Sequence, residues 1–140
     1  MLTAIASEEV SLSADTVWKV IGDFDDIRKW APAVMATRSE QTPEGKVRTL
    51  TMPPEGREVR ELLHAQGKYS YTYKFIGETP SARNYFGTVS VVPVSAGSSR
   101  IELKSEFDAG AGLTDEEAVA NMTKGVRGNL KAMKRALGLA

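Results

Sequence analysis

Arg48 and Glu61 are the two side chains of this sequence that are best placed to do chemistry together. Residues 47–52 and 57–65 alternate as strands on either side of a turn at 53–56, which holds two prolines and a glycine. Antiparallel pairing around this turn sets Arg48 opposite Glu61, and opposed residues share one face of a sheet. The shared face is the apolar one. An ion pair there is costly unless both charges are satisfied, so it indicates a lined cavity rather than a plain core.

Such a pair suits two kinds of chemistry. In an enzyme of the cyclase or isomerase type, Glu61 would be a general base, and Tyr71, Tyr73 or Arg48 would stabilise an enolate. The positive charge of Arg48 is expected to lower the pKa of Glu61, which would make the carboxylate a poor base. Arg48 would then serve to anchor a carboxylate or carbonyl at the polar end of an apolar ligand.

The strand predicted at residues 69–76 carries Tyr69, Tyr71, Tyr73 and Phe75 on one face by strict alternation. A three-residue turn at 66–68 would place Glu61 opposite Tyr73. Buried tyrosine hydroxyls need hydrogen-bond partners, so this row favours a cavity about as much as a plain core.

A last hairpin, at residues 85–94 and 100–108, adds Tyr85 and Ser105 to the same face. Its turn at 95–98 would pair Val89 with Ser105 and Gly87 with Phe107. The polar groups of the predicted cavity are therefore Arg48, Glu61, Tyr71, Tyr73, Tyr85 and Ser105, and the candidate catalytic residues are Glu61 and Tyr73. The apolar walls are expected from Leu50, Val59, Val89, Leu103, Phe107, Met122, Val126 and Leu130.

Several residues have a plainer interpretation. Trp18 and Trp30 are expected to pack in the core rather than to touch a ligand, because aromatic side chains dominate cores. His64 has the opposite parity from Glu61 and is expected to face solvent. Gly125 and Gly128 lie inside a predicted helix, where they either bring the helix close to the sheet, leave room for a ligand, or merely weaken the helix.

The composition excludes several classes of function. Lys+Arg and Asp+Glu are both 18, so the chain lacks the basic excess of a nucleic-acid-binding protein. There is no cysteine and only one histidine, which argues against thiol chemistry, a metal centre or a serine–histidine–aspartate triad. We find no run of ~18–20 apolar residues and no leader, so we expect a cytoplasmic protein without stable membrane insertion.

The remaining elements are read from their periodicity. A strand at residues 3–12 precedes a short helix that Ser13 caps and Gly22 ends, and a second short helix is predicted at 24–30. A strand follows at 34–41, and a capping box at Thr114–Glu117 opens a long helix that ends near residue 137. Seven mostly antiparallel strands and one long C-terminal helix predict a single α+β domain over residues 1–140.

This order of elements resembles the START/birch-pollen-allergen (SRPBCC) superfamily, in particular its polyketide cyclase/dehydrase-like branch. The segments that carry the resemblance are Val17-Trp18 through Asp23-Phe24 to Trp30-x-Pro32, Gly45-Lys46-Val47-Arg48-Thr49-Leu50, Val59-Arg60-Glu61-Leu62-Leu63, Pro80 through Asn84-Tyr85 to Pro93, and Asn129-Leu130-x-x-Met133-Lys134. The resemblance implies a helix-grip fold: a curved seven-stranded antiparallel sheet wrapped around the long C-terminal helix, with two short helices after the first strand and a cavity between sheet and helix.

The resemblance also bears on the cavity mouth. Segments 52–56 and 77–84 stand where the distantly similar plant abscisic-acid receptors have two loops that close over the pocket, but both lack the receptors' sequence patterns. Relatives often carry arginine at Leu62 and tryptophan at Leu103, so both leucines are expected to enlarge or dry the cavity.

Three functions stay open from the sequence. The first is binding of a small hydrophobic molecule, such as a lipid, polyketide or steroid-like compound, with no cofactor. The second is an aromatase/cyclase- or isomerase-type enzyme that acts on a polyketide-like ketone. The third is a co-chaperone-like protein-interaction module, for which a filled cavity and an exposed apolar patch would be the signature.

Overall fold

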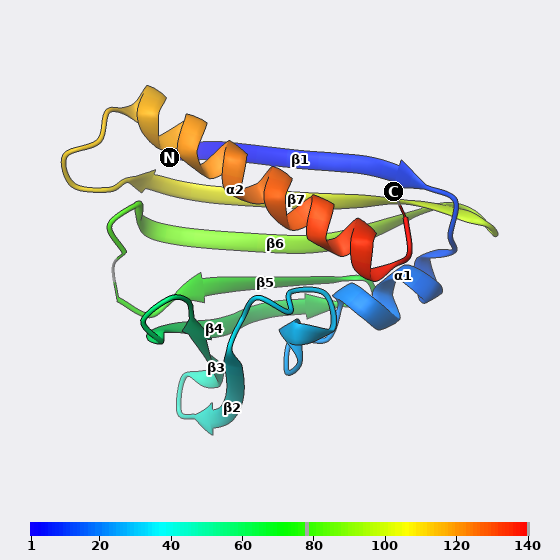
Figure 1. Ribbon diagram of the computed structural model, residues 1–140, viewed down its shortest axis with the longest axis horizontal. Coiled ribbons are helices and arrows are strands. Elements are labelled where there is room, and N and C mark those ends of the chain that lie inside the picture. Colours follow the sequence, from blue (N-terminus) through cyan, green and yellow to red (C-terminus); the bar gives the residue numbers. More distant parts are fainter. Residues whose placement is uncertain (78, 140) are drawn as a thin grey trace.

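One antiparallel sheet of seven strands forms most of the protein, and a long helix crosses one of its faces (Figure 1). The computed structural model describes residues 1–77 and 79–139. The elements are β1 (Leu2–Val10), α1 (Ala14–Ile21), η1 (Ile27–Lys29), β2 (Ala36–Thr42), β3 (Gly45–Met52), β4 (Arg57–Gly67), β5 (Ser70–Phe75), β6 (Ala82–Ser95), β7 (Ser98–Ala109) and α2 (Asp115–Ala136). The strand order is β1-β7-β6-β5-β4-β3-β2, so the sheet begins with the first strand and then returns through the others in reverse order.

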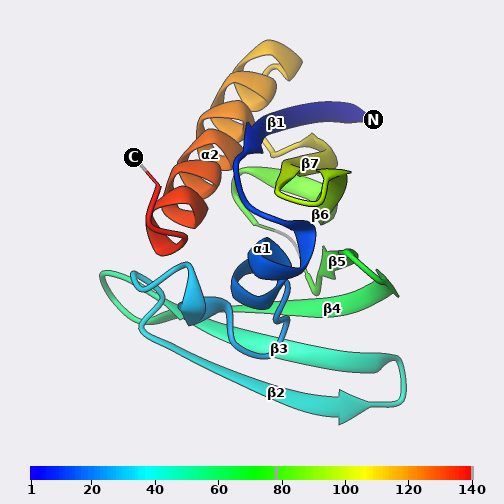
Figure 2. The ribbon, with the colours of Figure 1, turned by 90° about the vertical axis from the view of Figure 1, so that its right-hand side faces the viewer.

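Helix α2 begins where the sequence predicts. The Thr114 hydroxyl accepts a hydrogen bond from the Glu117 backbone N–H, and the Glu117 carboxylate accepts one from the Thr114 N–H, which completes the capping box. The residues that α2 buries against the sheet recur at helical spacing and are Ala118, Val126, Leu130 and Met133. In Figure 2 the sheet curves around this helix, and the helix-grip fold expected from the sequence is confirmed.

The segment between β1 and β2 is less helical than predicted. Ser13 caps α1 through a hydrogen bond from the Thr16 N–H, as expected. The helix predicted at residues 24–30 is only the single 3-10 turn η1. The reason lies just before it, where the Asp23 carboxylate accepts a hydrogen bond from the Asp25 N–H and holds the backbone in a turn rather than a helix.

The register of the β3–β4 hairpin is as predicted, with Arg48 opposite Glu61 and Leu50 opposite Val59. The other two hairpins are shifted by two residues from their predicted pairing. Glu61 lies opposite Phe75 rather than Tyr73, because the strands are joined more tightly and β4 bulges between residues 63 and 65.

In the β6–β7 hairpin, Val89 lies opposite Leu103 rather than Ser105, and Gly87 lies opposite Ser105 rather than Phe107. The turn is tighter than predicted, with Ser95 opposite Ser98, and an irregularity between residues 93 and 95 adds the second residue of the shift. A shift of two residues changes the cross-strand partner but not the face, so the side chains still point where the sequence placed them.

The exposed side of α2 carries two of the features raised by the sequence. Gly125 and Gly128 are exposed, and a side chain built at either would meet open space, so neither brings the helix close to the sheet.

Four cationic side chains of α2 line a groove of about 720 Å³ between this helix and β1. The groove residues are Ile5, Ala6, Ser7, Glu8, Arg127, Leu130, Lys131, Lys134, Arg135 and Leu139. Its one acid, Glu8, pairs with Lys134 at 2.5 Å.

In the part of the chain that the structure describes, no helix has both the length and the apolar character needed to cross a membrane.

Candidate functional site

A cavity of about 460 Å³ lies between the sheet and the C-terminal half of α2. The residues that line it come from η1 and the loop after it, from β3 to β7, and from α2. They are Ile27, Trp30, Ala31, Pro32, Ala33, Val34, Arg48, Leu50, Met52, Pro53, Glu61, Tyr71, Tyr73, Phe75, Tyr85, Gly87, Thr88, Val89, Leu103, Lys104, Ser105, Val126, Asn129, Ala132, Met133 and Arg135. The volume is within the range of small-molecule sites in proteins, roughly 300–1,000 Å³.

The Arg48–Glu61 pair is buried at the cavity wall, as the register predicts. Both Nε and Nη2 of Arg48 lie 2.7 Å from Oε1 of Glu61, and the two residues are 1% and 5% exposed. The guanidinium carbon lies 4.3 Å from the centre of the Phe24 ring and 5.1 Å from that of Tyr73. Aromatic faces and a carboxylate together replace the water that the arginine loses on burial.

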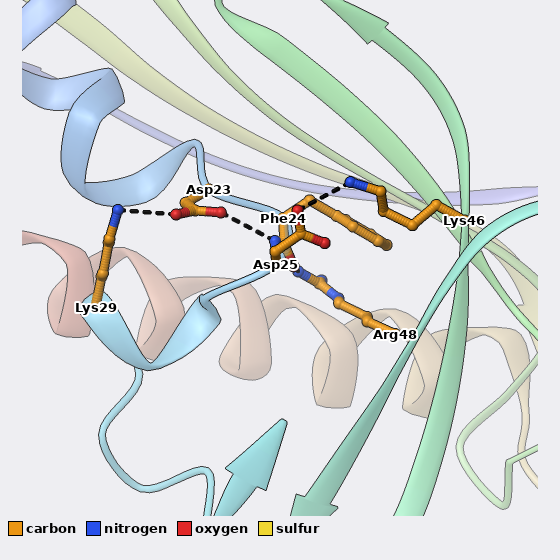
Figure 3. A network of polar contacts seen from close by, with 6 residues as sticks. All are labelled: Asp23, Phe24, Asp25, Lys29, Lys46 and Arg48. Atoms are coloured by element: carbon orange, nitrogen blue, oxygen red, sulfur yellow. Dashed lines mark hydrogen bonds and ion pairs between the residues drawn. The ribbon is translucent and has the colours of Figure 1, made fainter. Parts of the chain in front are cut away.

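Arg48 also holds the loop that follows α1 (Figure 3). Its Nη1 donates to the Phe24 carbonyl at 3.2 Å, and Lys46, two residues earlier on β3, donates to Asp25 at 2.9 Å. These contacts fix the start of the segment that brings Trp30 to the cavity. Arg48 is therefore a structural cross-link between the sheet and this loop as well as a cavity residue.

Three hydroxyls on neighbouring strands form a chain beside this pair. Tyr85 lies 2.8 Å from Ser105 and 3.3 Å from Tyr73, oxygen to oxygen. Burial raises the pKa of Tyr73 and of Tyr85 above the usual range, so both stay neutral and can donate hydrogen bonds. Tyr71 is buried next to them and receives a long contact, 3.5 Å, from Arg48.

The pKa of Glu61 departs from the sequence-based expectation. Burial raises the pKa of its carboxyl group, and the charge and hydrogen bonds of Arg48 offset only part of that effect, so the net direction is upward. Arg48 does lower the pKa, as expected, but the net shift is upward, because a carboxylate at this depth loses more hydration than one arginine restores. Burial lowers the pKa of the Arg48 guanidinium, but the charge of Glu61 together with the effects of Tyr71 and Tyr73 outweighs it, so the net direction is upward.

Most of the predicted site residues line this cavity. All six predicted polar residues do so, together with the predicted wall residues Leu50, Val89, Leu103 and Val126. Phe107 is fully buried in the core instead, and Leu130 lines the groove on the β1 side. Val59 and Met122 are half-buried and outside the lining. The α2 residues that line the cavity all lie in the second half of the helix, at Val126, Asn129, Ala132, Met133 and Arg135.

Some lining residues were missed or assigned elsewhere by the sequence analysis. Trp30 is buried in the core, as expected, but it also lines the cavity. Phe75 shares the predicted face with Tyr71 and Tyr73 but is not among the predicted site residues, and it lines the cavity with its ring stacked on Tyr85, centroids 4.2 Å apart. Gly87 has a clear role, because a Cβ there would lie 2.5 Å from the Tyr73 ring. The cross-strand pair of a glycine with an aromatic was the signal that could have found it.

The two segments proposed for the cavity mouth behave differently. Met52 and Pro53 of the first segment line the cavity, while no described residue of segment 77–84 does, and residue 78 lies outside the described part. Leu62 is opposite Val47 on the other face of the sheet, so it has no part in the cavity. His64 is exposed, as predicted, and contacts the Phe86 ring.

The fold and cavity agree with what sequence comparison finds. Residues 1–138 match the family described as polyketide cyclase / dehydrase and lipid transport. The chain therefore belongs to this family, and its sheet and long C-terminal helix form a helix-grip fold.

Solved structures of similar proteins include a putative uncharacterized protein from Bacillus thuringiensis, with 27% identity, a TM-score of 0.82, and coverage of 97% of this chain and 98% of that one. The protein XoxI from Bacillus cereus is 29% identical with a TM-score of 0.80, over 98% of this chain and 96% of that one. The Zhui aromatase/cyclase from Streptomyces sp. R1128 shares the fold at 19% identity and a TM-score of 0.69, over 97% and 90% of the two chains. No curated protein matches the chain.

Proposed function

We propose that this protein binds a small apolar molecule in the cavity between the sheet and α2. The observation that carries the proposal is the combination of size and lining: about 460 Å³, walls of aliphatic and aromatic side chains, and a few convergent polar groups. The polar groups come from Glu61 and from the hydroxyls of Tyr73, Tyr85 and Ser105. The family description, which names both polyketide chemistry and lipid transport, fits a ligand of this character.

The first test is native mass spectrometry of protein purified from its own host, followed by denaturing extraction of any bound molecule. We expect a stoichiometric apolar adduct that survives gentle desolvation. A clean apo mass would be followed by titration with a fluorescent apolar dye. Failure of the dye to bind at micromolar concentration would refute the proposal.

A matched pair of variants locates the binding site. Leu103→Trp adds a large ring inside the cavity and is expected to abolish dye binding, because Leu103 is 4% exposed and lines the site. Val94→Trp adds the same side chain at a position that is 49% exposed and outside the lining, and should leave binding unchanged. Equal binding by both variants would place the ligand elsewhere. Thermal melting of both checks that each still folds.

The second candidate function is an enzyme of the aromatase/cyclase or isomerase type. One observation favours it: burial raises the pKa of Glu61, which moves the carboxyl group toward the range in which it can exchange a proton with a substrate. The neutral hydroxyls of Tyr73 and Tyr85 could stabilise an enolate oxygen. Turnover of a polyketide-like ketone that vanishes in Glu61→Gln, while ligand binding survives, would establish the enzyme. Binding without turnover would establish a carrier.

A further inference from the structure

The polar contacts inside the cavity select among apolar ligands, and this selection rests on the binding function proposed above. The sequence alone made Arg48 the anchor for a ligand carboxylate. In the structure its Nε donates to Glu61 and its Nη1 to the Phe24 carbonyl, its Nη2 lies 2.7 Å from the same Glu61 oxygen, and a longer contact reaches Tyr71. These contacts engage all three nitrogens of the guanidinium. Aromatic rings also cover the guanidinium, so Arg48 has no free pair of N–H groups that could bind an incoming carboxylate.

The group left open at this wall is an acceptor. Both nitrogens of Arg48 converge on Oε1 of Glu61. Among residues 1–77 and 79–139, no group donates a hydrogen bond to Oε2. This oxygen is also not one of the fully buried side-chain atoms in these ranges that lack a partner, which are Trp30 Nε1 and Thr37 Oγ1. Glu61 lines the cavity, so Oε2 is the atom it offers there. A carboxylate oxygen can only accept hydrogen bonds, and a buried one without a donor is strongly unfavourable.

The hydroxyl chain supplies the complementary group. Tyr73, Tyr85 and Ser105 have one hydrogen each and make two contacts with one another. One O–H therefore remains to donate to an oxygen of a ligand. Tyr73 stands diagonal to Glu61 on the same face of the sheet, because Glu61 pairs with Phe75, two residues along β5.

We infer that the cavity takes a neutral, hydroxyl-bearing apolar molecule, a phenol or an alcohol, whose O–H donates to Oε2 of Glu61, and that it rejects carboxylates. A carboxylate ligand would bring a second negative charge next to Oε2 of Glu61, the oxygen that Arg48 does not contact, in a site with little water. A ligand with no donor would leave Oε2 dry and unpaired. Of these three ligand types, only the hydroxyl satisfies the open oxygen and leaves the net charge of the site unchanged.

The test uses three probes with one skeleton: 2-naphthol, 2-methoxynaphthalene and 2-naphthoate. Isothermal titration calorimetry of the wild-type protein at pH 7 measures each Kd. We expect 2-naphthol to bind about tenfold or more tightly than either of the others, which is the scale of one hydrogen bond to a charged group. Because this comparison needs only the wild type, it does not depend on whether a variant folds.

Two variants attribute the preference to Oε2. In Glu61→Gln the amide oxygen is expected to stay with Arg48, which turns the amide N–H₂ toward the cavity and replaces the acceptor with a donor. The naphthol preference should then fall below about threefold, and the methoxy compound should gain. Glu58→Gln is the matched control on the same strand, where the side chain is exposed and pairs with Arg38 at the surface. It should bind all three probes as the wild type does.

The outcomes separate this inference from the function on which it rests. Equal or tighter binding of 2-naphthoate or 2-methoxynaphthalene would overturn the inference and leave apolar ligand binding in place. A naphthol preference that is unchanged in folded Glu61→Gln would also overturn it. If none of the three probes binds and the fluorescent dye also fails, both the inference and the proposed function fall.

Discussion

Removal of Arg48 is the sharpest test of how the site is built. The pair it forms with Glu61 is almost fully buried, with two nitrogen–oxygen distances of 2.7 Å. Arg48→Ala leaves a carboxylate in the interior without its counter-charge, which typically costs about 3–5 kcal/mol. It also removes the donor to the Phe24 carbonyl, so the loop after α1 loses one of its contacts to β3. We expect a loss of that size in the free energy of unfolding at pH 7, measured by urea denaturation.

Two further measurements test whether the loss of stability comes from the unpaired charge of Glu61. Near pH 4 the loss should shrink, because Glu61 without Arg48 takes up a proton and is no longer charged. The double variant Arg48→Met/Glu61→Leu should recover most of the stability, because it removes both buried charges at once. Arg38→Ala is the control, since that arginine pairs at the surface, 66% exposed, and should cost less than about 1 kcal/mol. A loss below ~1 kcal/mol in Arg48→Ala, or a double variant as unstable as the single one, would refute the reasoning.

Three more predictions follow from the described contacts. Burial raises the pKa of Glu61 in the folded chain above its ordinary value of 4.5, so the free energy of unfolding of the wild type, relative to Glu61→Gln, should fall as the pH rises from about 4.5. A rise over the same range in paired urea melts would mean that Arg48 controls the titration. Gly125→Ala should stabilise α2 by about 0.5–1 kcal/mol, because the added methyl group meets open space, and a decrease in melting temperature would show that the position is covered. Gly87→Ala should destabilise the protein by about 1–3 kcal/mol and weaken ligand binding, because its Cβ displaces the Tyr73 ring. Unchanged binding and stability would rule out a positioning role for this glycine.

The sequence predicted the face of the sheet on which each side chain lies better than it predicted the cross-strand partners. The β3–β4 hairpin has no bulge, so counting from its turn gives the observed partner of Arg48. Counting fails in the hairpins of Tyr73 and Val89, because their turns are tighter than predicted and irregularities in β4 and β6 each change the register by one residue without any clear mark in the sequence. Each shift is of two residues, which keeps alternate side chains on the same face. The polar cluster was therefore assembled correctly from two incorrect registers.

The extent of the cavity could not be predicted from the sequence. Helical spacing identifies Met122 and Val126 as equivalent positions of one apolar stripe. Whether a stripe residue meets the sheet or an open space depends on how the helix crosses the strands, and only Val126 lies over the cavity. The pKa of Glu61 had the same limitation, because its direction depends on how far burial exceeds the effect of Arg48.

The cationic surface of α2 has a consequence for how the whole molecule behaves in solution. Lys+Arg and Asp+Glu balance at 18 each, yet residues 118–139 hold five cations and no acid, so the rest of the chain carries the matching acidic excess. Such a distribution leaves a locally positive surface on this part of α2 although the net charge of the protein is close to zero. We therefore expect it to adsorb to a cation-exchange resin near its isoelectric point of about 6.6, with the α2 side toward the beads. Salt of about 0.1 M should release it, since that concentration screens charges beyond ~10 Å.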